Sequence, residues 1–241
     1  MDVASAVKAA GHQRMLSQRM VKSYLMLGQG IAPDDARAIL QGSITQFESQ
    51  LATLKTFQPT QKVRNALFLM EGAWARCKPL LTAAPSQAGA AELYDANEAL
   101  QQAAHSTVLA YVDVNSEAID HLVGVAGRQR MLSERMAKFY LYRTWGLYDA
   151  PADMELHLAR AHFTAVLIQL ERSPLASAQT RAAVALVRRE WEPYQQALFG
   201  SRDLVKMRRE APRVAALSER VLWATGELVA QLAARPQGAS R

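Results

Sequence analysis

Cysteine, proline, glycine and aromatic residues are all scarce in this chain of 241 residues. Cys77 is the single cysteine, which excludes a scaffold of intrachain disulfides. The 9 prolines and 12 glycines stand in short clusters, and no segment shows the alternating pattern of a sheet strand. No apolar run approaches the ~20 residues that cross a bilayer, so we predict no membrane insertion.

The residues that are abundant favour helix. Hydrophobic residues make up 50% of the chain, and the mixture of Ala, Leu, Gln, Arg and Glu is typical of helical proteins. Prolines and glycines divide the first half into expected helices over 3–28, 33–57, 60–81 and from 90 onward. Gly146, Pro151, Ser173-Pro174 and residues 200–203 divide the second half in the same way. We therefore predict an all-α fold of two up-down four-helix bundles.

One stretch of sequence occurs twice. Residues 10–28 read AGHQRMLSQRMVKSYLMLG and residues 126–144 read AGRQRMLSERMAKFYLYRT, at a constant offset of 116 residues. A repeat at nearly half of the chain length indicates one structural unit that is made twice. The predicted modules are residues 1–115 and 116–235, followed by a disordered tail over 236–241.

The join between the two modules leaves two arrangements open. Between Ala90 and Gly124, only Asp113, Asn115 and Ser116 resemble residues that cap a helix. If the helix continues through this region, the two bundles stack end to end. If the chain turns near 113–116, the bundles lie side by side.

A helical wheel places Arg14 in the middle of a stripe of small and apolar residues. At about 100° per residue, this stripe also contains Val7, Ala10, Gly11, Ser17, Gln18, Val21, Leu25 and Gly28. Arg130 lies in the corresponding stripe of the second copy. Because Leu16 and Met20 form another apolar face that suits the helix's own bundle, the Arg14 face is expected to pack against a second partner.

Two interpretations of Arg14 and Arg130 follow. In the structural one, each guanidinium is exposed or pairs with a carboxylate, as most arginines do. In the functional one, the two guanidiniums repel each other across a seam, and a small oxyanion between them removes the repulsion. Arg19 and Arg135, on a more polar flank, are expected to form surface or structural pairs, and the repeated methionines to fill the core.

The net charge of +6 leaves several partner classes open. A nucleic acid, anionic lipid, a small anion and a merely solvated surface with excess arginine all fit such a balance. The basic residues are spread along the chain and are dense only over 181–189 and 206–213. No recognition helix or aromatic platform accompanies them, so we predict no nucleic-acid partner.

The titratable residues form no pattern typical of an enzyme. The five histidines lack the spacing of a helical metal site such as H-E-x-x-H, and neither a nucleophile–base pair nor a glycine-rich phosphate loop is evident. We therefore predict no enzyme activity, no metal and no cofactor.

The pattern A-G-x-Q-R-M-L-S-[QE]-R-M resembles the signature of the PilJ-type domain, the N-terminal domain of type IV pilus methyl-accepting chemotaxis transducers. A looser form, A-G-x-x-R-M-x-S-x-R, resembles the first helix of nitrate/nitrite sensor kinases. The resemblance implies a periplasmic four-helix sensor module that acts in chemotaxis or signal transduction, and hence a signal peptide removed ahead of Met1. It also implies that nitrate or a similar anion binds where two first helices meet.

Carried over to this chain, the implied ligand-binding residues are Arg14 and Arg130, three residues after Gly11 and Gly127. Ser17 and Ser133 lie on the same faces. In relatives the two first helices come from the two chains of a homodimer. Here the duplication would supply both from one chain, so we expect either a monomer that acts as a pseudo-dimer or a homodimer.

The two copies differ at one position of the signature, where Glu134 replaces Gln18. One turn from Arg130, Glu134 is expected to pair with that arginine and to weaken anion binding. The chain shows no kinase region or methyl-accepting helix, so any signal would pass to a partner protein. The predicted function is nitrate or nitrite sensing without an output domain; the alternative is a helical structural or adaptor protein of a signalling or pilus-related system.

Overall fold

The computed structural model describes residues 1–114, 118–173 and 176–233, with only the backbone described over 118–123 and at 233. This part of the chain forms eight helices and no strand, which confirms the all-α prediction. The helices are α1 (Val3–Gly28), α2 (Pro33–Lys55), α3 (Gln61–Thr82), α4 (Gln87–Val112), α5 (Ala118–Thr144), α6 (Asp149–Arg172), α7 (Ala178–Phe199) and α8 (Leu204–Ala233).

Side-chain caps explain where several helices begin. Thr60 Oγ1 accepts from the amide of Val63 at the start of α3, as the sequence predicts. Ser86 caps α4 in the same way, so α4 begins before the expected Ala90. The turns after α1 and α5 repeat each other, since Gly30 and Gly146 both adopt a positive φ, of 67° and 80°.

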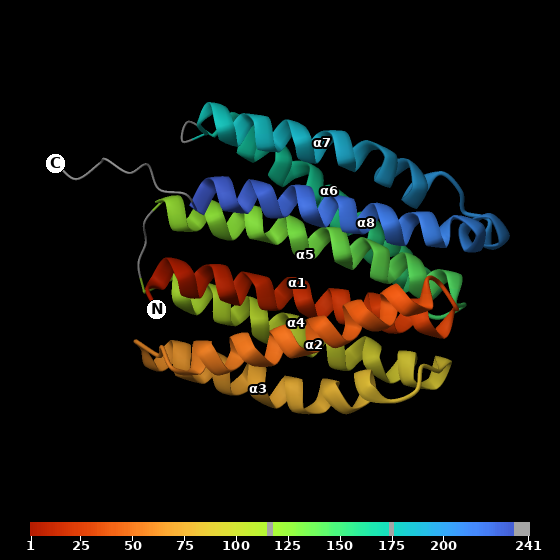
Figure 1. The fold of residues 1–241 in the computed structure, drawn as a ribbon, viewed down its shortest axis with the longest axis horizontal. Helices are drawn as coiled ribbons and strands as arrows, with labels where there is room; N and C mark the ends of the chain where they lie inside the picture. The colour runs from red at the N-terminus through yellow and green to blue at the C-terminus, as the bar shows by residue number, and fades with distance from the viewer. Residues whose placement is uncertain (115–117, 174–175, 234–241) are drawn as a thin grey trace.

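The two bundles lie side by side. Because α1 (Val3–Gly28) packs along α5 (Ala118–Thr144), the end-to-end arrangement is excluded. In Figure 1, α1 and α5 run next to each other in the same direction through the middle of the molecule. Helices α2–α4 lie on the outer side of α1, and α6–α8 on the outer side of α5. The predicted tail over 236–241 falls outside the described residues.

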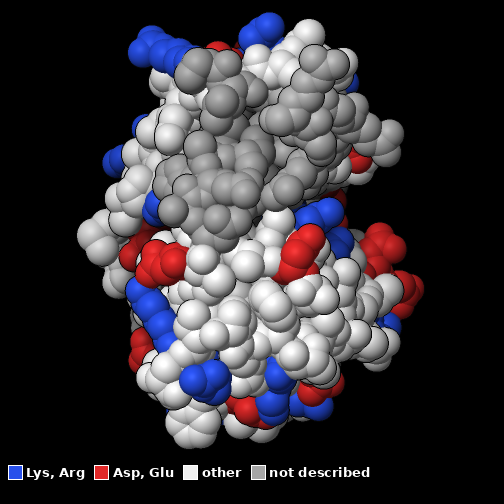
Figure 2. Space-filling view, turned by 90° about the vertical axis from the view of Figure 1, so that its left-hand side faces the viewer, with Lys and Arg blue, Asp and Glu red and all other residues white. Residues whose placement is uncertain are grey.

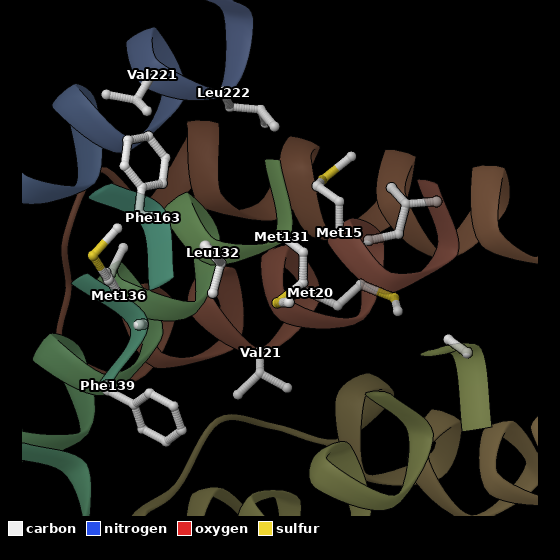
Figure 3. Packing of buried hydrophobic residues seen from close by; sticks show 14 of the residues in the cluster. Met15, Met20, Val21, Met131, Leu132, Met136, Phe139, Phe163, Val221 and Leu222 are labelled. Carbon is white, nitrogen blue, oxygen red and sulfur yellow. The ribbon is translucent and has the colours of Figure 1, made fainter. Parts of the chain in front are cut away.

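One continuous apolar core serves both modules. The buried side chains of all eight helices belong to a single cluster rather than to two separate ones. Figure 3 shows Met15 and Met20 of α1 and Met131 of α5 among the residues of this core, and all three are at most 3% exposed. The methionines therefore fill the core, as the sequence predicts, and their flexible side chains suit a seam between two copies of one helix.

The packing reproduces the repeat in detail. Gln13 donates from Nε2 to the carbonyl of Phe47 at 2.9 Å, and Gln129 donates to the carbonyl of Phe163 at the same distance. Each bond ties the first helix of a module to the second. The shared motif thus has a structural part, which positions the first helix in its own bundle.

Two clusters of buried charge join the modules, and the first lies between α1, α5 and α8. Lys22 Nζ lies 2.7 Å from Glu134 Oε2 and 2.5 Å from Glu219 Oε1, and Arg19 pairs with the same Glu219. The side chains of Lys22 and Glu134 are fully buried, where a charge without a counter-charge is strongly destabilising. Burial raises the pKa of Glu134, and the charge of Lys22 opposes that rise.

The second cluster repeats this design with the modules exchanged. Lys138 Nζ of α5 lies 2.9 Å from Asn97 Oδ1 and 2.6 Å from Glu98 Oε1 on α4. Arg135 contacts Glu98 and Glu155 at 2.8 Å each. Burial lowers the pKa of Lys138 to about 8, although the charge of Glu98 raises it. Arg19 and Arg135 thus form structural pairs, as expected. Arg19 of α1 contacts Glu219 of α8 in the other module, and Arg135 of α5 contacts both Glu98 of α4 and Glu155 of α6.

The difference between Gln18 and Glu134 means that each of the two clusters has a second carboxylate. In the second cluster, Glu155 of α6 supplies a second carboxylate. The counterpart of Glu155 in the first module is Ile39, which carries no charge, so Glu134 takes over that part in the first cluster. Gln18, the counterpart of Glu134, instead donates to Asn97 Oδ1 at 3.3 Å.

The surface at one end of the molecule carries both signs of charge. Figure 2 shows the end where the N-terminus lies, and Lys, Arg, Asp and Glu side chains all occur over its described surface. On this face the net charge of +6 does not gather into a single basic patch. Such a surface matches the solvated reading of the charge.

Replacing Lys22 with Met tests the first charge cluster. The variant leaves Glu134 buried without its cation, so we expect the free energy of unfolding in urea to fall by about 3–5 kcal/mol. Adding Glu134→Gln should restore part of that loss. The control is Lys55→Met, which breaks an ion pair with Glu71 whose side chains are 42% and 50% exposed. It should cost less than about 1 kcal/mol, and equal losses in the two Met variants would refute the cluster's role.

Candidate functional site

Arg14 is buried where α1, α4 and α5 meet. It is 3% exposed. Its Nη1 donates to Nδ1 of His105 at 3.2 Å, and its Nη2 donates to the carbonyl of Gly124 at 3.3 Å. Its Nε is buried with no hydrogen-bond partner. Both acceptors are neutral, because an imidazole nitrogen that accepts a hydrogen bond carries no proton.

Arg130, the equivalent of Arg14, lies in different surroundings. It lines a cavity of about 340 Å³ between α1, α2 and α5. Its Nε is also buried without a hydrogen-bond partner. Most of the side chains that line the cavity can donate hydrogen bonds. The lining residues are Ser5, Lys8, Ala9, His12, Gln46, Gln50 and Arg130.

The charges at the seam lie close enough to affect one another. Burial, followed by the charges of Arg128 and Arg130, lowers the pKa of Arg14 to about 10. Burial alone lowers the pKa of Arg130 to about 10. Both guanidiniums stay protonated at neutral pH, so the repulsion between them persists.

The neighbouring histidines respond to these arginines. Burial and then the charge of Arg130 lower the pKa of His12 to about 4, although its hydrogen bond with Gln50 raises it. Burial and then the charges of Arg14 and Arg128 lower the pKa of His105. Both imidazoles are therefore neutral at pH 7 and do not add to the positive charge there.

We call Lys8, Arg14, Arg128 and Arg130 the seam cations. Lys8 shares the cavity with Arg130, and Arg128 lies near Arg14, with its Nη2 3.4 Å from Nδ1 of His162. Among the residues that the structure describes, no carboxylate forms an ion pair with any of the four. This arrangement is chemically suited to attract and bind an anion.

The other predicted site residues lie beside the two arginines. A Cβ on Gly11 would lie 3.9 Å from Nη2 of Arg14, whereas a Cβ on Gly127 would meet no atom within 4 Å. Ser17 and Ser133 each donate the hydroxyl hydrogen to a carbonyl of their own helix, at 2.8 and 2.9 Å. The structure thus brings the two copies of the site together across the seam, while their role in ligand binding stays a prediction.

The expected pair between Glu134 and Arg130 is wrong. Although the two residues are one turn apart, the carboxylate of Glu134 lies against Lys22 of α1. Its charge is held in the first charge cluster and does not pair with Arg130. The difference between Gln18 and Glu134 therefore gives no reason to expect a weakened site.

Reasoning from the repeated residues misses Lys8, His12, Gln50 and His105. These residues surround the arginines, but their equivalents in the other copy are different amino acids, so a comparison of the two copies does not single them out. For His12 and Arg128 a signal exists, since both stand inside the repeated segment at equivalent positions and are both basic types.

Two variants test the electrostatics of the seam. Arg130→Gln should raise the pKa of His12 above its value of about 4, because the charge of Arg130 lowers it. Arg14→Gln should raise the pKa of His105 for the same reason. Each variant serves as the control for the other, and both pKa values can be followed by NMR of the imidazole ring protons. If neither histidine responds, the guanidiniums do not lie where the structure puts them.

Comparison with known families explains this arrangement. The model of the type IV pili methyl-accepting chemotaxis transducer N-terminal domain matches residues 2–100 and, a second time, residues 115–221. Comparison with curated proteins and with solved structures finds no match. The two matched segments cover most of the chain and correspond to the two bundles, each with its own copy of the arginine motif. The chain therefore belongs to the family of type IV pili methyl-accepting chemotaxis transducer N-terminal domains, of which it contains two tandem copies.

Proposed function

We propose that this chain senses a small oxyanion, such as nitrate or nitrite, which binds between α1 and α5 through Arg14 and Arg130. The family is one of sensory and signalling domains rather than of enzymes. The observation that carries the proposal is the set of seam cations, which no described carboxylate neutralises. An anion there would supply the missing counter-charge and relieve the repulsion between the guanidiniums.

The contrast with the buried lysines supports this proposal. Lys22 and Lys138 occupy the same seam; Lys22 has two carboxylates within 2.7 Å, and Lys138 has one at 2.6 Å. The chain thus supplies counter-charges where the cations only hold the modules together. At Arg14 and Arg130 the described residues supply none, which fits a counter-ion that comes from solution.

The alternative function, a structural or adaptor protein, requires a different pairing. It is favoured if an acidic side chain lies within hydrogen-bond distance of each guanidinium. Among the described residues, Arg14 instead contacts His105 and the carbonyl of Gly124. The proposed sensor role is accordingly the better supported of the two.

The proposed location is the periplasm, where sensory domains of this family meet solutes from outside. Within the described residues, none of the helices has the length and hydrophobicity needed to cross a membrane. A signal would then reach the cell through a partner protein that contacts the outer surface of the bundles.

Calorimetric titration with nitrate and with nitrite tests the proposed function. The unaltered chain should release or absorb heat with a saturable profile, and the double variant Arg14→Ala/Arg130→Ala should lose this binding. Arg37→Ala/Arg213→Ala is the matched control, because it removes two arginines that are each 57% exposed and form local ion pairs. It should bind as the unaltered chain does. No saturable heat with any small oxyanion, or unchanged binding by the double variant, would exclude the proposed site.

A further inference from the structure

The surroundings of Arg14 and those of Arg130, which we call the two halves of the seam, are not equivalent, although the motif is the same in both. Lys8 lies in the surroundings of Arg130. The residue that corresponds to Lys8 by the offset of 116, and that contacts Arg14, is Gly124. Lys8 lines the Arg130 cavity with its side chain. Gly124 has no side chain, and its carbonyl accepts a hydrogen bond from Arg14.

The Arg14 half is closed. Arg14 is buried, and two of its nitrogen atoms already donate to His105 and Gly124. Val166, the counterpart of Gln50 by the same offset, is a buried apolar residue that offers no donor. An anion that entered this half would have to displace the bonds that Arg14 already makes.

The Arg130 half is open and contains hydrogen-bond donors that a ligand could use. The guanidinium of Arg130 makes no hydrogen bond with any described residue, and it lines an open cavity of about 340 Å³. Lys8 adds a second charge on one wall, and Gln46 and Gln50 present carboxamides on the other. His12 is held by Gln50, whose amide nitrogen lies 2.8 Å from Nδ1.

We propose that one chain binds a single anion, away from the pseudo-twofold axis, in the cavity of Arg130, with Lys8 as the second cationic ligand. This inference rests on the proposed function and refines it in one respect, because it replaces direct binding by Arg14 with an effect of the Arg14 charge. The repeated arginine would then have two roles: Arg130 binds the anion directly, and Arg14 contributes through its charge while it holds α1 against α4 and α5.

The chemistry of the cavity points to a planar monoanion. A guanidinium presents its donors in one plane, which matches the two oxygens of a carboxylate or of nitrate. The cavity volume is roughly ten times the ~30 Å³ that one water molecule occupies in the liquid. It therefore has room for a carboxylate on a small organic molecule as well as for nitrate, and the two sources are separated by titrating each.

The test is calorimetry with nitrate and, separately, with acetate, on the intact chain and on single variants. We expect one site per chain for the preferred probe. Arg130→Ala should weaken binding by more than about tenfold, as expected for the loss of a charged donor pair. Lys8→Gln should weaken it by about five- to tenfold, and Lys8→Arg should bind within about twofold of the unaltered chain. Arg14→Ala should weaken binding less than Arg130→Ala does.

Lys206→Gln is the charge-matched control. It removes one exposed lysine near the start of α8, at the end of the molecule opposite the N-terminus, and should leave the affinity unchanged. A second measurement does not depend on variants. Bound anion should raise the pKa of His12, which lines the cavity, and change the pKa of His105 less.

The outcomes separate this inference from the proposed function. If the chain binds a probe, but Arg14→Ala and Arg130→Ala lose it equally while Lys8→Gln is unaffected, the anion lies on the axis and the inference is wrong, although the sensor role stands. Two sites per chain would refute it as well. If the unaltered chain binds no small oxyanion, both the function and the inference fail.

Discussion

A helix packed against a second copy of itself brings like charges together, and this constraint governs the whole seam between α1 and α5. Arg14, Arg19 and Lys22 each have a cationic equivalent on the facing helix. The chain meets the constraint in two ways. Lys22 and Lys138 receive carboxylates from neighbouring helices, so that their burial binds the two modules. Arg14 and Arg130 receive no carboxylate from the described residues, and on this difference the proposed function rests.

Much of the fold follows from the sequence. Proline, glycine and capping residues mark the helix ends, and α1 ends at Gly28 as expected. The arrangement of the bundles does not follow, because it depends on the direction of α5 relative to α4, and the sequence between these helices offers only weak helix-ending signals. Local patterns also cannot reveal a partner that is distant along the chain. Lys22 and Glu219 are 197 residues apart, so their pairing becomes visible only in the folded molecule.

The same limit applies to the candidate site. The helical wheel identifies Arg14 and Arg130 and the seam on which they lie, since these depend on the period of one helix. It cannot identify Lys8, which lies on α1 and lines the same cavity as Arg130. It also assigns Glu134 to Arg130 from their spacing, whereas packing commits that carboxylate to Lys22. Lys8 and Glu134 both differ from their equivalents in the other copy, so a comparison of the shared residues does not reveal the different surroundings of the two arginines.

The connection of the two modules through α4 and α5 has a thermodynamic consequence. When two separate chains supply the facing helices, their association depends on protein concentration, and dilution takes the site apart. Within one chain the association is intramolecular, with an effective concentration set by the short connection. The seam therefore stays assembled at any dilution, and the affinity of the proposed site would be a property of the single molecule rather than of the amount of protein present.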